Sequence, residues 1–175
     1  MVDQSPDVAR ISIRYNTRHL HLTEAEGSFG DLNGLVYYAG LVAATEAMDA
    51  DAPRGSIRVK EADGVARTVM SESLVERISY NSPLEIVIVV SGIYGMGMTI
   101  AHGLIHLWQR VQQARVDQGT VNLQLEAQRI LLEDLIARRL DPELLVQRDH
   151  HANLMLGGAA NAAAKIASIE VEQAP

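Results

Sequence analysis

Alternating apolar and polar residues near the N-terminus predict a strand with one buried face. Ile11, Ile13 and Tyr15 alternate with polar residues, which is the period of a half-buried strand. Apolar residues then recur three and four positions apart over 31–48, after Ser28, a residue type that caps helices. We therefore expect a first strand followed by one amphipathic helix.

Two further short strands are expected in the first half of the chain. Apolar and charged residues alternate over 57–60, and Gly64 marks a turn after them. The segment 75–80 alternates less regularly and is followed by the turn-forming sequence Asn81-Ser82-Pro83. The range 1–83 thus predicts a small α+β unit, in which a mixed sheet packs against one helix.

The stretch from Ile86 to Trp108 contains no Asp, Glu, Lys or Arg. Its 23 residues would suffice to cross a membrane as a helix. Four small residues are spaced four apart and would form a ridge for close helix packing. They are Ser91, Gly95, Thr99 and Gly103. The glycine and histidine residues weaken this interpretation, because polar groups in the hydrocarbon region cost free energy.

A buried strand, a glycine turn and a helix explain the same stretch without a membrane. The β-branched residues at its start are typical of a buried strand, and Pro83 and Gly92 flank that run. We favour this interpretation, with a strand over 84–90, a turn over 91–97 and a helix from Met98.

A phosphate-binding loop is the third interpretation of this stretch. The residues from Gly92 to Thr99 have the glycine spacing of a P-loop and follow an expected strand. Met98 stands where that loop has the lysine that contacts the phosphates. The missing charge argues against nucleotide binding, and we expect no cofactor.

The segment 110–140 is charged, favours helix and carries an apolar stripe. The stripe consists of Val121, Leu125, Leu132, Leu135 and Ile136. Gly119-Thr120 is expected to interrupt the helix. We expect this helical arm to bind another protein or a second copy of the chain through the stripe.

The C-terminal part of the chain predicts a short helix and a last strand. Asp141 followed by Pro142 is typical of a helix start, so a short helix should run towards Gln147. After an alanine-rich run over 159–167, the alternation over 169–171 indicates a strand. A single strand needs a partner, and the N-terminal sheet is the expected one.

Composition and charge exclude several functional classes. The chain has 175 residues, 15 Lys and Arg against 22 Asp and Glu, and a formal net charge of −7. This charge argues against nucleic-acid binding, which needs a clustered basic surface. The absence of cysteine excludes disulfides and thiol nucleophiles and fits a reducing compartment. Because the N-terminus has neither a basic start nor an apolar run, we expect a cytoplasmic protein.

Few residues have a spacing that suggests chemistry. His102 and His106 are four apart and would share one helix face, as two metal ligands do. Gly103 follows His102 where the metalloprotease pattern has glutamate, so the pair is a weak candidate for metal binding. No serine lies in a Gly-x-Ser-x-Gly sequence, and we expect no catalytic residues.

The sequence divides into four expected parts. They are the α+β unit 1–83, the uncharged segment 84–108, the helical arm 109–150 and the alanine-rich tail 151–175. We predict a non-enzymatic interaction module that self-associates, or docks on a protein partner, through the arm. The alternative is a membrane-inserted protein in which the small-residue ridge drives helix association.

Overall fold

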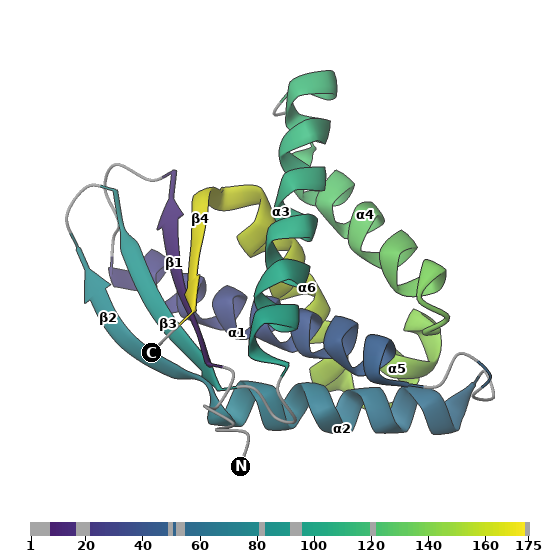
Figure 1. Ribbon diagram of the computed structural model, residues 1–175. Helices are drawn as coiled ribbons and strands as arrows, with labels where there is room; N and C mark the ends of the chain where they lie inside the picture. Colours follow the sequence, from purple (N-terminus) through teal and green to yellow (C-terminus); the bar gives the residue numbers. More distant parts are fainter. Residues whose placement is uncertain are drawn as a thin grey trace, which may run out of the picture.

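The computed structural model describes residues 8–16, 22–48, 51, 55–80, 83–91, 96–119 and 122–173. Its elements are β1 (Val8–Tyr15), α1 (Leu22–Ala47), α2 (Ser56–Glu72), β2 (Leu74–Ser79), β3 (Glu85–Ser91), α3 (Gly97–Gln118), α4 (Leu123–Ala137), α5 (Pro142–Arg148), α6 (His150–Lys165) and β4 (Ile166–Gln173). Figure 1 shows the sheet on one side of the molecule and α4 and α5 on the other. The expected α+β class is confirmed.

The four described strands form one antiparallel sheet in the order β2-β3-β1-β4. Strand β1 lies between β3 and β4, so Ile11 is opposite both Ile88 and Val171. The alternate residues of β1 from Ala9 to Tyr15 are buried, as the strand period predicts. The expectation of a mixed sheet is wrong, because all three strand pairings are antiparallel.

Helix α2 replaces the short strand that was expected over 57–60. Val59, Ala62, Ala66 and Val69 are buried at helical spacing. The alternation over four residues was too short to decide the period, and this longer spacing overrides it. Strand β2 does form close to its expected position.

The uncharged segment contains a strand and the start of a helix, which confirms the favoured interpretation. Strand β3 ends at Ser91 and helix α3 begins at Gly97, while residues 92–95 lie outside the described part of the chain. The alternative interpretation, in which one helix runs through the whole segment, is wrong. Among the residues described, no helix combines the length and apolar character that a membrane crossing requires.

The last strand returns to the N-terminal strand, as expected, and follows α6 directly. Three side chains of α3 hold this junction. Trp108 and Gln112 donate to the carbonyl of Ile166, and Arg115 donates to the carbonyl of Ala164 at 2.5 Å. These bonds satisfy carbonyls at the end of a helix, where no intrahelical donor remains.

Helix α1 is the central helix and packs against α6, α2 and α3. Small residues permit these close contacts. A Cβ on Gly34 would lie 2.2 Å from the carbonyl oxygen of Met155 in α6, and one on Gly40 would lie 2.7 Å from the Cα of Ala66 in α2. The core therefore depends on alanine and glycine at the helix crossings.

The expected arm over 109–150 comprises the second half of α3, α4 and α5. Helices α3 and α4 meet near the top of the view in Figure 1 and diverge from there. The predicted break is confirmed at Gly119, which has a positive φ of 79°. The predicted start of α5 is also confirmed, since the Asp141 side chain accepts from the backbone N–H groups of Glu143 and Leu144. The strands of the sheet come from three of the four expected parts, and the division itself stays a prediction.

Candidate functional site

The two histidines considered as metal ligands lie on the exposed side of α3. His102 and His106 are one helical turn apart, as predicted. Across the ranges that the structure describes, no group of three or more His, Asp or Glu residues could hold a metal ion. The pair therefore has no third ligand among these residues.

The four small residues of the predicted ridge do not share one helix. Ser91 ends β3, Thr99 lies in the first turns of α3, and Gly95 lies outside the described residues. Gly103 does serve a close helix contact, because a Cβ there would lie 3.2 Å from a methyl group of Val42. That contact is with α1 of the same chain.

The predicted arm interface divides into outward and inward residues. Leu125 and Ile136 are 64% and 62% exposed, and Leu132 lies partly buried between them on the same face of α4. Residues seven and eleven positions apart point in nearly the same direction on a helix. Leu135 points inward and is fully buried, and Val121 lies outside the described residues.

Two hollows flank Leu132 on this outer face of α4. One has a volume of about 750 Å³ and also contacts Ile136. The other has a volume of about 350 Å³ and reaches α6 at Leu156. Leu132, Pro142 and Glu143 line both hollows, so the two form one continuous surface between α4 and α5. We call this surface, with Leu125 and Ile136, the α4 face.

Charged side chains border the α4 face. Arg129 forms ion pairs with Glu126 and Glu133 in the same helix. These hydrogen bonds lower the pKa of Glu126 and raise that of Arg129, so both groups stay charged near neutral pH. The arrangement of an apolar centre and a charged rim is typical of protein interfaces.

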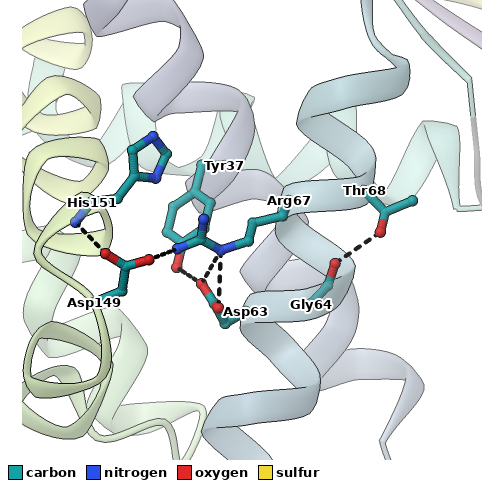
Figure 2. Close-up of polar contacts among 7 residues, drawn as sticks. All are labelled: Tyr37, Asp63, Gly64, Arg67, Thr68, Asp149 and His151. Carbon is teal, nitrogen blue, oxygen red and sulfur yellow. Dashed lines mark hydrogen bonds and ion pairs between the residues drawn. The ribbon is translucent and has the colours of Figure 1, made fainter.

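A buried polar cluster that the sequence did not predict joins three helices. Tyr37 of α1 donates a 2.6 Å hydrogen bond to Asp63 of α2, which also accepts from Arg67 at 3.0 Å. Arg67 reaches Asp149 at 2.8 Å, and Asp149 accepts from the backbone N–H of His151 at the start of α6 (Figure 2). This cluster therefore links α1, α2 and the first turn of α6.

A second cluster of the same kind joins α1 to α4. Tyr38 donates to Asp134, which accepts a 2.8 Å hydrogen bond from Arg138. Arg110 of α3 lies 3.6 Å from the same carboxylate. Asp134 is 8% exposed, so its charge is largely shielded from water. Two guanidinium groups compensate this charge.

A short repeated pattern in the sequence marks the acid–arginine pair of each cluster. The sequences Asp63-Gly-Val-Ala-Arg67 and Asp134-Leu-Ile-Ala-Arg138 place an acid four residues before an arginine on a helix. The adjacent residues Tyr37 and Tyr38 supply the two phenol groups. Sequence alone does not show that these phenols reach the acids, because they come from a distant helix.

The electrostatics of these clusters favours a structural role. Burial raises the pKa of Tyr37 and Tyr38, and the adjacent carboxylates raise it further, so both phenols stay protonated donors. None of the tyrosine, aspartate and arginine residues of the two clusters lines either hollow of the α4 face. We therefore take the α4 face as the candidate functional site and the clusters as its support.

Comparison with known proteins gives no match: no protein-family model, curated protein or solved structure is similar to this chain.

Proposed function

We propose that this protein is an interaction module that self-associates through the α4 face. One observation carries the proposal: Leu125, Leu132 and Ile136 lie along one outward face of α4, beside two connected hollows. Burial of exposed apolar side chains against a partner lowers the free energy, because it removes them from water. The hollows form a concave surface that such side chains can fill. Residues in such pockets contribute most to the binding free energy of an interface.

Self-association is the simplest form of this docking. Most soluble oligomers are homomeric, and in a two-fold dimer each copy contributes the same surface. Leu132 lies between Leu125 and Ile136 along the helix. A two-fold axis at the level of residues 130 and 131, with the two α4 helices antiparallel, would bring Leu125 of each copy opposite Ile136 of the other.

The absence of native cysteine permits a direct crosslinking test. Gln128 is exposed on α4, and Ser71 is exposed on α2 as a matched control position. A short bismaleimide should crosslink Gln128→Cys into a dimer and leave Ser71→Cys uncrosslinked. Leu132→Glu combined with Ile136→Glu should abolish the Gln128→Cys crosslink, because two charges would be buried in the interface. An equal crosslinking yield at both positions would contradict the proposal.

We also propose the cytoplasm as the compartment. The support for this is the cysteine-free composition, which fits reducing conditions.

A further inference from the structure

Among the strands that the structure describes, β2 lies at an outer edge of the sheet and is paired on one side only. Its partner is β3, and the opposite edge of the sheet is β4. The free side of such a strand presents backbone N–H and C=O groups that another strand can pair with.

The two edges differ in the side chains they present. On β2 and just after it, Leu74, Val75 and Tyr80 are 67%, 51% and 69% exposed. On β4, the exposed residues include Glu170 and Glu172. Pairing of β4 with a second β4 would bring these carboxylates together, which is unfavourable. Edge β2 has no such like-charge barrier.

The order of residues in β2 is complementary to itself. Glu76 and Arg77 stand at its centre, with Val75 before them and Ile78 after them. In an antiparallel pair with a two-fold axis between residues 76 and 77, Glu76 of one copy would lie opposite Arg77 of the other. Val75 would lie opposite Ile78. One kind of central pair thus joins opposite charges and the other joins two apolar side chains.

We infer that β2 pairs with β2 of a second copy and joins the two four-stranded sheets into one continuous sheet. The register shift in β2 lies between Val75 and Arg77, so the strand has one regular run on each side of Glu76. The proposed axis passes beside this bulge. Each regular run would therefore pair with the other run of the second copy.

The side-chain positions in the single chain agree with this geometry. Glu76 and Arg77 lie on the outer face of the sheet, where they form ion pairs with Arg10 and Glu85, both at 2.8 Å. A two-fold axis perpendicular to the sheet keeps this outer face common to both copies. The charges of one copy would thus meet those of the other on the same face.

This inference is independent of the α4 face. Strand β2 lies at the opposite side of the molecule from α4 (Figure 1). The association should therefore persist when the α4 face is disabled, and we choose Ile136→Glu as the background for the test.

Charge reversal tests the pairing. Arg77→Glu leaves two glutamates at the centre of each strand, and Glu76→Arg leaves two arginines. Each variant alone should raise the dissociation constant about tenfold or more, because like charges then face each other. An equimolar mixture of the two should restore dimerisation as a heterodimer. Glu170→Arg, on the other edge, is the matched control and should leave the dissociation constant unchanged.

A fourth variant tests the pairing without removing an ion pair of the folded chain. Val75→Lys keeps both ion pairs with Arg10 and Glu85 and should also weaken association. Folding of every variant is checked by circular dichroism and association by sedimentation equilibrium. The inference is overturned if the Ile136→Glu protein does not dimerise, if folded Arg77→Glu or Val75→Lys protein dimerises as before, or if the charge-reversed mixture stays monomeric.

Discussion

At the scale of single residues, two buried aspartates stabilise the arrangement of the helices. Asp63 and Asp134 are both 8% exposed, and each accepts from a tyrosine of α1 and from the arginine four positions later in its own helix. A buried charge is tolerated only when such partners replace water. The two clusters therefore make the position of α1 depend on specific polar contacts as well as on packing.

Removal of one carboxylate should be costly. Asp134→Ala leaves the Tyr38 hydroxyl and the Arg138 guanidinium without their acceptor, and we expect a loss of about 3 kcal/mol in the free energy of unfolding. Glu133→Ala removes the neighbouring exposed carboxylate and should cost far less. Urea denaturation of both variants measures the difference. Equal losses would contradict the structural role of the cluster.

Asp149 gives a pH-dependent prediction. The His151 backbone N–H and then the Arg67 guanidinium lower the pKa of Asp149 below its ordinary value. The folded state thus binds this proton less readily than the unfolded state, so the stabilisation is present above the unfolded pKa and is lost as pH falls through the folded one.

The matched variant for this test is Asp149→Asn, which keeps a helix-capping side chain and removes the charge. We expect wild type to be more stable than Asp149→Asn at neutral pH, with a difference that shrinks below about pH 4. Urea denaturation at several pH values measures this difference in the free energy of unfolding. A difference that stays constant from neutral pH into acid would contradict the assignment.

At the scale of elements, the sequence predicted those with a clear period or strong end signals. The strand around Ile11, the strand–helix division of the uncharged segment and the start of α5 at Asp141 all formed as expected. The prediction over 57–60 was wrong because four alternating residues also fit the longer helical pattern of α2. Extended apolar patterns and capping residues were thus more informative than short alternations.

The crossing of α1 and α6 gives a prediction for this scale. Gly34→Ala places a Cβ against the backbone of α6 and should cost at least about 2 kcal/mol, since the backbone cannot move aside easily. Gly30→Ala, one turn earlier in α1, meets no atom within 4 Å and should be neutral or stabilising. Thermal denaturation measures both. A Gly34→Ala protein as stable as Gly30→Ala would contradict the close crossing.

At the scale of the whole molecule, the sheet joins distant parts of the chain. Strand β1 pairs with β3 from the middle and β4 from the C-terminal end. The sequence predicted these strands but not their order, because strand periodicity does not specify partners. Likewise, the stripe in 110–140 predicted apolar contacts but did not separate Leu135, which packs inside, from Leu132 and Ile136, which face outward.

The most direct test of the central claim, that the α4 face mediates self-association, is sedimentation equilibrium over about a hundredfold range of protein concentration. It compares the wild type with the combined variant Leu132→Glu and Ile136→Glu. We expect the average mass of the wild type to rise with concentration above the 19.1 kDa of one chain and to exceed that of the variant, which keeps only the pairing through β2 and should not pass the mass of a dimer. Identical mass profiles for the two proteins would contradict the claim.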